Sequence, residues 1–285
     1  MWQRTLNQSA SFCRRRAAIL IAHTQFARVR RVALLVFSLP FLLLAVPGLA
    51  QELIVQADRW CPYNCDPGAA EPGYAIELMQ TIFAPAGVKI KYEIVPWDRA
   101  LMQAQDGTAS AAVAAVRVQA DTHGLLVGNE PIGTSNDCLF VAASNPLKFQ
   151  KADDLDSLKA VAIVSGYTYS QELGVWLDRP ENKHKILIQR GARPAESNAM
   201  NLALGRLDGV VENRHVMQHT IFKLGLEHQV ISAGCQKEVP VYIAFNANLE
   251  NVQQLIKKLD DGIDKLRREK QLAKILGKYG LNDWK

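Results

Sequence analysis

Residues 89–116, KIKYEIVPWDRALMQAQDGTASAAVAAV, decide the fold class of this chain. The first part, Lys89–Val95, alternates apolar and polar residues, as a strand with one buried face does. Pro96-Trp97-Asp98 then begins a helix, and we expect Asp98 to be its N-cap. The small and apolar run Ala109–Val116 is typical of a strand buried on both faces. A strand, a helix and a second strand in this order predict α/β layers around parallel strands.

The same alternation extends in both directions along the chain. On the amino-terminal side we expect a strand at Glu52–Ala57 and a helix at Tyr74–Phe83, where apolar residues recur at helical spacing. A second α/β unit begins near Ala160. Its expected elements are strands at Val161–Val164, Ile186–Gln189, Gly209–Val211 and Val241–Phe245 and a helix at Glu196–Leu204. The carboxyl-terminal tail predicts an amphipathic helix with apolar positions Val252, Leu255, Ile256, Leu259, Ile263 and Leu266.

The amino-terminal 50 residues have the pattern of a secretory signal. Residues 1–31 contain seven arginines and no Lys, Asp or Glu. The apolar run Val32–Val46 follows, and the small residues Gly48 and Ala50 come after it. This order predicts a signal peptide at residues 1–50 that is cut after Ala50, which places the protein in the periplasm. The alternative is a membrane anchor, but a fifteen-residue run falls short of the roughly 20 residues that a span needs.

Removing that leader changes the charge of the protein. The whole chain has a formal net charge of +5. Without the seven leader arginines, 26 of its 33 basic residues remain against 28 acidic ones, a net charge of about −2. A nucleic-acid-binding protein carries a basic surface, and this chain then has no excess of basic residues. We therefore expect no nucleic-acid partner, no stable membrane insertion and a monomer.

Four cysteines remain after the leader, namely Cys61, Cys65, Cys138 and Cys235. An even number in an exported chain predicts disulfides, with three possible connectivities. The short spacing from Cys61 to Cys65 favours a local disulfide, and a Cys138–Cys235 disulfide is possible. No histidine stands at zinc-finger spacing from these cysteines. His215 and His219 are four residues apart, but no third ligand follows at a recognisable spacing, so we expect no metal and no cofactor.

The sequence contains none of the common catalytic motifs. There is no G-x-S-x-G elbow, no phosphate-binding G-x-x-x-x-G-K-[ST], no G-x-G-x-x-G and no H-E-x-x-H. Carboxylate acid/base sites leave weaker traces, so these absences lower the expectation of an enzyme without excluding one. We expect a binding protein.

The order of short motifs resembles the bacterial extracellular solute-binding proteins of family 3, the polar amino-acid-binding class. The resemblance covers nearly all of residues 51–285. The motifs that carry it are Trp60-Cys61-Pro62-Tyr63, Gly73-Tyr74, Pro96-Trp97-Asp98-Arg99-Ala100-Leu101, Gly166-Tyr167, Gly205-Arg206-Leu207-Asp208 and Lys278-Tyr279-Gly280. It implies a two-lobed periplasmic-binding-protein-like fold (type II), with ligand held in the cleft between the lobes.

Two hinge strands would join these lobes. Carried onto this chain, the resemblance makes Asp137–Ala142 the first crossing and Val241–Asn246 the return. Lobe one would then comprise residues 51–138 and 246–285, and lobe two residues 139–245. Binding of ligand would close the lobes by a hinge motion.

The resemblance also implies which side chains line the cleft. Tyr63 and Trp97 stand where the family places aromatic rings, and Trp60 is close by; such rings bury apolar area and can face a cation. The alternative for Trp60 and Trp97 is a place in the core. Tyr167 and Thr168 are expected at a helix N-terminus, where free N–H groups bind anions. A capping role for Thr168 is equally compatible with its spacing.

The charged groups that read an α-amino acid in this family are displaced here. Arg117 stands where the family usually has Thr, and Thr122 where it has Arg. Asn213 replaces the usual Asp and follows Glu212 directly. Two interpretations are open: Arg117 reads a carboxylate and Glu212 an amine, or the ligand is not an α-amino acid. Arg99 is a further candidate for reading an anion, and its alternative role is a salt bridge with a neighbouring carboxylate.

The sequence therefore predicts a periplasmic protein that captures a small polar solute, an amino acid or a related carboxylate, for the permease of an ABC transporter. One alternative is a sensory module of the same fold whose closed form docks to a receptor. The other is a dehydratase-like enzyme in which Glu212 would be a general base.

Overall fold

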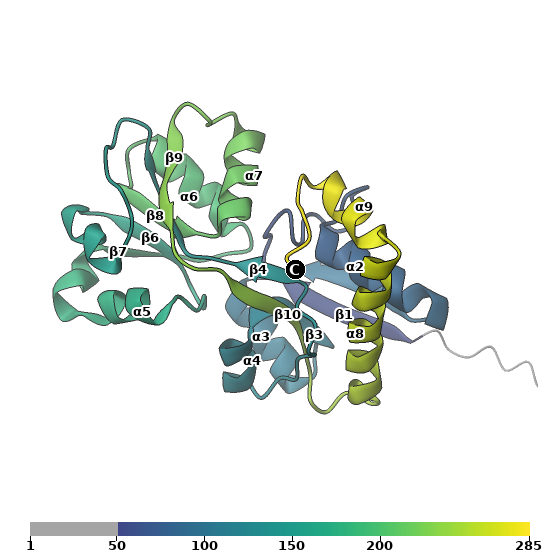
Figure 1. The fold of residues 1–285 in the computed structure, drawn as a ribbon. Coiled ribbons are helices and arrows are strands. Elements are labelled where there is room, and N and C mark those ends of the chain that lie inside the picture. Colours follow the sequence, from purple (N-terminus) through teal and green to yellow (C-terminus); the bar gives the residue numbers. More distant parts are fainter. Residues whose placement is uncertain (1–50) are drawn as a thin grey trace, which may run out of the picture. The chain divides into compact units, whose positions relative to one another are not determined.

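Two five-stranded sheets organise residues 51–285, which are the residues that the computed structural model describes (Figure 1). The expected signal peptide, residues 1–50, lies outside the described residues. The first sheet has the order β2-β1-β3-β10-β4 and the second β7-β6-β8-β5-β9. The strands are β1 Glu52–Ala57, β2 Lys89–Ile94, β3 Ala111–Val116, β4 Gly133–Ser135, β5 Cys138–Ala142, β6 Val161–Val164, β7 Ile186–Gln189, β8 Gly209–Glu212, β9 Val230–Cys235 and β10 Val239–Phe245.

Helices flank both sheets. The α-helices are α2 Tyr74–Phe83, α3 Trp97–Asp106, α4 Arg117–Thr122, α5 Gln171–Asp178, α6 Pro194–Ala203, α7 Arg214–Leu224, α8 Val252–Arg268 and α9 Gln271–Lys278. Three short 3₁₀ helices add η1 Ala84–Ala86, η2 Ala152–Ser157 and η3 Pro180–Lys185. We call the first sheet with α2, α3, α4, α8 and α9 lobe one, and the second sheet with α5, α6 and α7 lobe two.

The stretch 89–116 forms the strand–helix–strand unit that its pattern predicts. Strand β1 pairs in parallel with both β2 and β3, and α3 connects these two neighbours. Helix α3 begins at Trp97 with Pro96 as its N-cap, so the expectation that Asp98 caps it is wrong. Asp98 lies in the first turn, where its negative charge interacts favourably with the positive end of the helix dipole.

The carboxyl-terminal helix covers lobe one, as its pattern predicts. All six expected apolar positions of α8 are buried. They pack with α2, and Ile76, Met79 and Phe83 of that helix are fully buried in the same core. Figure 1 shows α8 and α9 side by side with α2 beside the first sheet.

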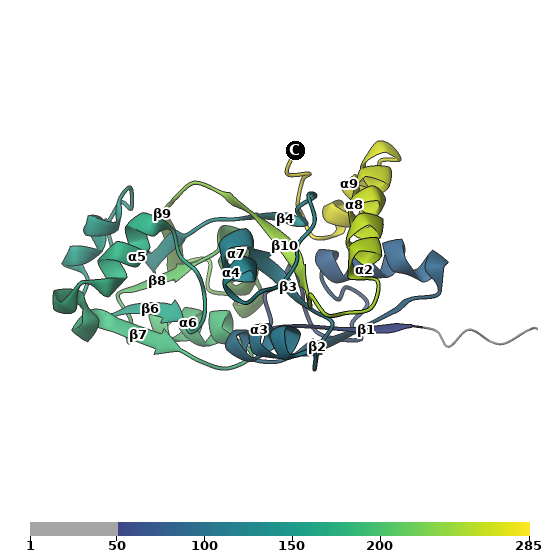
Figure 2. The ribbon, with the colours of Figure 1, turned by 90° about the horizontal axis from the view of Figure 1, so that it is seen from below.

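The chain crosses between the sheets twice. The first crossing runs from Ser135 to Cys138 and the second from Cys235 to Val239. The two connections are hydrogen-bonded, because the Gln236 amide donates to the Asp137 carbonyl, and Figure 2 shows β4 and β10 side by side.

The second crossing lies earlier in the chain than the sequence indicates. All of β10 belongs to the first sheet, so lobe one resumes at residue 239 and not at 246. An apolar run of this kind fits either sheet equally well, and its partners β3 and β4 decide its place.

Both disulfides have formed. The predicted Cys61–Cys65 disulfide is confirmed, and the second joins Cys138 to Cys235. Cys138 lies directly opposite Cys235 in the β5–β9 ladder. The second disulfide therefore ties together the two strands of lobe two at the point where they leave for lobe one.

No helix within residues 51–285 is long and apolar enough to cross a membrane. Among the same residues, no group of three or more His, Cys, Asp or Glu side chains is arranged to hold a metal ion. His215 and His219 both lie on α7 and are half-buried.

Candidate ligand-binding site

A cavity of about 50 Å³ lies where residues of the two lobes meet. Four of the residues proposed from the sequence line it: Trp60, Trp97, Tyr167 and Thr168. Sequence reasoning missed the other seven, namely Asp58, Val113, Ala114, Val116, Gln119, Ser135 and Val241. Asp58 directly follows β1 and Val116 ends β3, and α/β sheets bind ligands at such carboxyl ends of strands.

Trp60 is held between the two lobes. Its indole Nε1 donates a hydrogen bond of 3.0 Å to Glu212 Oε1 of lobe two. Its ring packs on Tyr63 with 4.3 Å between the ring centroids. The Cys61–Cys65 disulfide closes the loop that carries both rings, and Trp60 forms an isolated bridge with Asn64 at the base of that loop.

Tyr63 does not line the cavity. Its side chain is 1% exposed and lies behind Trp60. Its hydroxyl donates to the main-chain carbonyl of Thr134, and its ring also packs on Tyr74. Tyr63 is therefore not one of the aromatic rings that line the cleft, as the resemblance implied; it supports Trp60 from the core of lobe one.

Asp58 is the acidic group that sequence reasoning overlooked. It is the first residue after β1, lines the cavity and is 3% exposed. Its Oδ2 accepts a hydrogen bond of 2.7 Å from the Tyr167 hydroxyl of lobe two. Burial raises the pKa of this carboxyl to about 7, against a hydrogen bond from Tyr167 that lowers it. A polar residue directly after a buried strand was the signal that could have found it.

Glu212 lies behind the Trp60 indole and does not line the cavity. It ends β8 and is 2% exposed. Its Oε1 accepts from Trp60 and from the Asn213 amide, and its Oε2 has no hydrogen-bond partner among the described residues. Burial raises the pKa of Glu212 to about 8.

Asn213 has a structural role. Its Oδ1 accepts from the amides of His215 and Val216, so it is the N-cap of α7. Its Nδ2 donates to Ser135 Oγ at 3.1 Å, and a longer contact of 3.4 Å reaches the Tyr63 hydroxyl. These bonds use the side chain fully, and Asn213 is not among the residues that line the cavity.

Neither candidate arginine lines this cavity. Arg99 is exposed on α3 and makes no ion pair in the described part of the chain. The adjacent carboxylate, Asp98, accepts instead from Ser165 Oγ of lobe two at 2.7 Å. Arg117 begins α4 and is also exposed. Its Nη2 donates to the Gly128 carbonyl at 2.9 Å, and its guanidinium lies 4.7 Å from the centroid of the Tyr242 ring.

Tyr167 and Thr168 do not lie at a helix N-terminus. Helix α5 begins at Gln171, and its N-cap is Ser170, whose Oγ accepts from the Leu173 amide. The expected Thr168 cap is therefore wrong, and Tyr167 and Thr168 reach the cavity from the loop before the helix.

One backbone position in the cavity wall is strained. Ala114 in β3 has φ 73°, a left-handed conformation that residues with a Cβ rarely adopt. It lies at a β-bulge: Ala115 pairs with Tyr242 of β10, and Val113 with the next residue, Ile243. Such strain is often stored at functional sites.

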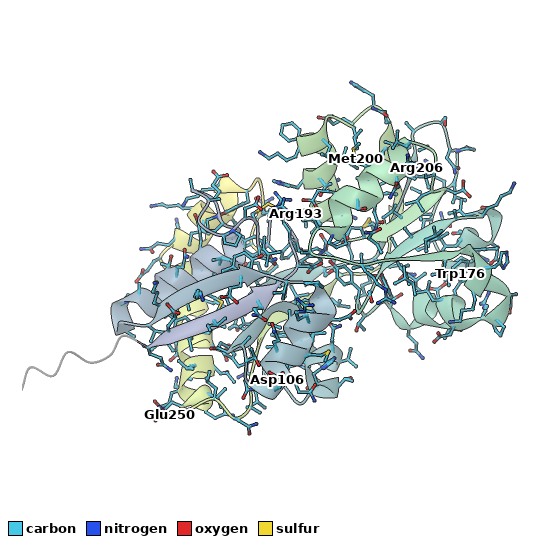
Figure 3. The ribbon with its side chains drawn as sticks, turned by 180° about the vertical axis from the view of Figure 1, so that it is seen from behind. Asp106, Trp176, Arg193, Met200, Arg206 and Glu250 are labelled. Atoms are coloured by element: carbon cyan, nitrogen blue, oxygen red, sulfur yellow. A yellow bond between two sulfur atoms is a disulfide. The ribbon has the colours of Figure 1, made fainter. Side chains whose placement is uncertain are left out.

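Further hydrogen bonds and ion pairs join the lobes around the cavity. Gln119 Nε2 donates to the Gly166 carbonyl at 2.5 Å. Arg59 of lobe one pairs with Glu196 of α6 at 2.5 Å. Arg193, labelled in Figure 3, pairs with Asp66 of lobe one at 2.6 Å. The two lobes are thus held in a closed arrangement.

Comparison with known proteins identifies the family. The model of the bacterial extracellular solute-binding proteins, family 3, matches residues 53–282. The chain belongs to this family. A search of curated protein sequences found no match to this solute-binding protein.

Solved structures similar to this solute-binding protein share its fold at low sequence identity. An ancestral arginine-binding protein bound to arginine has a TM-score of 0.66 at 18% identity, over 80% of this chain and 97% of that one. AbpA, an amino acid ABC transporter substrate-binding protein from Streptococcus pneumoniae bound to L-arginine, has a TM-score of 0.62 at 20% identity, over 80% and 94%. A histidine kinase sensor domain with similarity to periplasmic binding proteins has a TM-score of 0.65 at 16% identity, over 80% and 95%. The fold is thus the two-lobed type II periplasmic-binding-protein fold.

Proposed function

We propose that this solute-binding protein is exported to the periplasm and captures a small polar solute, an amino acid or a related carboxylate, in the cavity between its lobes. It then delivers the solute unchanged to the permease of an ABC transporter. The observation that carries this proposal is the convergence of a buried carboxylate, Asp58, with the rings of Trp60, Trp97 and Tyr167 on one interlobe cavity.

The chemistry of that cavity suits the amine end of a polar solute. No Lys or Arg is among the residues that line it. The Asp58 carboxylate accepts one side-chain hydrogen bond, from Tyr167, and has further lone pairs for a donor. Aromatic faces attract cations as well as apolar groups. Micromolar affinity corresponds to about −8 kcal/mol, which a charged hydrogen bond and ring burial together can supply.

The cavity is too small to admit a solute while the lobes stay closed. One water needs roughly 10–15 Å³ of such volume, so about 50 Å³ corresponds to a few water molecules. The lobes must therefore move apart at the two crossings for a solute to enter, and they then close around it on a wider cavity than this one.

Similar structures support the amino-acid class. The ancestral protein and AbpA are both described as bound to arginine. A sensory role is the second candidate, because a histidine kinase sensor domain has the same fold. Glu212, the general base suggested from the sequence, does not line the cavity, because its carboxylate is bonded to the Trp60 indole.

The test begins with the full chain expressed in a bacterium and purified from the periplasm. A thermal-shift screen against amino acids, polyamines, dicarboxylates and small aromatic acids should give at least one stabilising amino acid or related carboxylate. Calorimetry should then give a micromolar dissociation constant, and the solute recovered from the protein should be unaltered. N-terminal sequencing should find Gln51 as the first residue. A flat screen, or recovery of a converted product, would contradict the proposal.

A further inference from the structure

A second cavity of about 270 Å³ adjoins the first, beside the two crossings between the lobes. The two cavities share three lining residues, Val116, Ser135 and Thr168. They differ in charge. The first is lined by the carboxylate of Asp58, whereas Arg117 and Lys237 line the second.

Arg117 is held in place by lobe one and still has N–H groups to offer. A guanidinium has five N–H donors, and one of them is used in the bond to the Gly128 carbonyl. The stacking on Tyr242 keeps the side chain beside β10. Lys237, two residues before β10, is exposed and forms no ion pair within residues 51–285. Two cations thus line one cavity, Arg117 from the start of α4 and Lys237 from the second crossing.

The two carboxylates near these cations accept hydrogen bonds from neighbouring residues. Asp137 also lines the second cavity, but its Oδ2 accepts from the Ser170 amide at 2.7 Å. Burial raises the pKa of Asp137. Glu238 accepts from Thr134 Oγ1 at 2.8 Å. Neither carboxylate forms an ion pair with Arg117 or Lys237 within residues 51–285, so both cations can bind an anion that enters the cavity.

The two charges of the site are therefore separated in space. Asp58 does not line the second cavity, and Arg117 and Lys237 do not line the first. In an α-amino acid the ammonium and carboxylate groups are attached to the same carbon. Such a molecule can satisfy one end of the site and leaves the other end without a partner.

We propose that the two cavities form one binding site for a linear solute with an amine at one end, bound by Asp58, and a carboxylate at the other, bound by Arg117 and Lys237. An ω-amino acid has this arrangement of charges. This inference rests on the proposed function, because it names the class of solute that the same site takes.

Four six-carbon probes test the arrangement by calorimetry. They are 6-aminohexanoate, its α-amino isomer norleucine, hexylamine and hexanoate, and shorter and longer ω-amino acids extend the series. The best ω-amino acid should bind more than about tenfold more tightly than norleucine, hexylamine or hexanoate, since a charged hydrogen bond contributes about 1.5–3 kcal/mol.

Substitutions test which residues bind the amine and which bind the carboxylate of the solute. Two single variants, Lys237→Gln and Arg117→Gln, test the carboxylate end. In each, the ω-amino acid should bind no more tightly than hexylamine, and the affinity for hexylamine should be unchanged. Asp58→Asn should weaken the binding of both amines but not that of hexanoate. Arg99→Gln is the matched control, because Arg99 is exposed and lines neither cavity. Circular dichroism melts establish that each variant is folded.

Three outcomes would overturn the inference. If norleucine or another α-amino acid binds more tightly than every ω-amino acid, the proposed function stands and the separated-charge site does not. If the Lys237 and Arg117 variants lose affinity for hexylamine and for the ω-amino acid equally, those cations do not bind the carboxylate. The same follows if the variants keep both affinities. If a folded protein binds no solute of either screen, both proposals fail.

Discussion

Gly166 is a residue of lobe two that lies directly against lobe one. Its φ is +77°, and a Cβ built on it would lie 1.7 Å from Oδ1 of Asp98 in lobe one. Its carbonyl accepts from Gln119, also of lobe one. A side chain at this position therefore meets two obstacles, a backbone conformation that favours glycine and a carboxylate across the cleft.

We predict that Gly166→Ala lowers ligand affinity by more than tenfold. The left-handed backbone costs about 1 kcal/mol whatever the surroundings, but the contact with Asp98 exists only when the lobes are closed. Calorimetry would measure the affinity, and small-angle X-ray scattering would measure closure with the ligand.

Gly205→Ala is the matched control for this prediction. Gly205 lies in the same lobe with φ +68°, and a Cβ there would have nothing within 4 Å. Gly205→Ala has the same cost of a left-handed backbone but no clash across the cleft. This variant should therefore lose free energy of unfolding and keep its affinity for the ligand. Equal affinities of the two variants would show that Gly166 does not limit closure.

At the scale of elements, the Cys138–Cys235 disulfide is the covalent link between β5 and β9. The two cysteines are 97 residues apart in sequence, whereas Cys61 and Cys65 are 4 apart. A disulfide stabilises a protein mainly by restricting the unfolded chain, and the effect grows with the length of the closed loop.

We predict a larger loss of stability from the Cys138→Ala/Cys235→Ala variant than from the Cys61→Ala/Cys65→Ala variant. The long loop corresponds to about 4.7 kcal/mol and the short one to about 2 kcal/mol. Urea unfolding followed by circular dichroism would give both free energies of unfolding. A greater loss of stability in the Cys61→Ala/Cys65→Ala variant would contradict the prediction. It would indicate that the packing of the Trp60 loop matters more to stability than the entropy of the unfolded chain.

At the scale of the whole described protein, closure of the lobes buries two carboxyl groups that bond across the cleft. Tyr167 donates to Asp58, and Trp60 donates to Glu212. Burial raises the pKa of Asp58 from 3.8 to about 7 and that of Glu212 from 4.5 to about 8. Neighbouring acids contribute to both increases: Glu196 and Asp98 act on Asp58, and Asp58 and Asp137 act on Glu212.

We therefore predict that closure is favoured at low pH. A carboxyl with a raised pKa binds more protons in the closed form than in the open form, where water restores its ordinary pKa. This contribution to closure is complete below the ordinary values near 4 and is lost as the pH rises through 7 to 8. Between about pH 6 and about pH 9 the closed-to-open ratio should fall by more than about tenfold.

Small-angle scattering of the unliganded protein across this range would measure that ratio through the radius of gyration. The Asp58→Asn/Glu212→Gln variant is the control, and its closure should not change with pH in this window. A wild-type protein that closes further as the pH rises would contradict the prediction.

The local pattern of the sequence determined most of the elements. The expected bounds of β1, α2, β6 and β7 agree with the structure to the residue. The periodicity that defines a strand or helix extends over a few neighbouring residues, so the chain itself contains that information. The Cys61–Cys65 disulfide is similar, because a short loop brings the two thiols together.

Tertiary structure decided the direction of the charged side chains and the partners of the strands. Trp60, Trp97, Tyr167 and Thr168 line the cavity from positions that the sequence suggested, but Tyr63 turns into the core. Arg117 faces the second cavity, and Asp58 provides the acidic group of the first. Likewise, only its pairing with β3 and β4 assigns β10 to lobe one. The physical reason is that contacts between residues far apart in the sequence set the direction of a side chain and the partner of a strand, whereas residues close in sequence set the helix or strand itself.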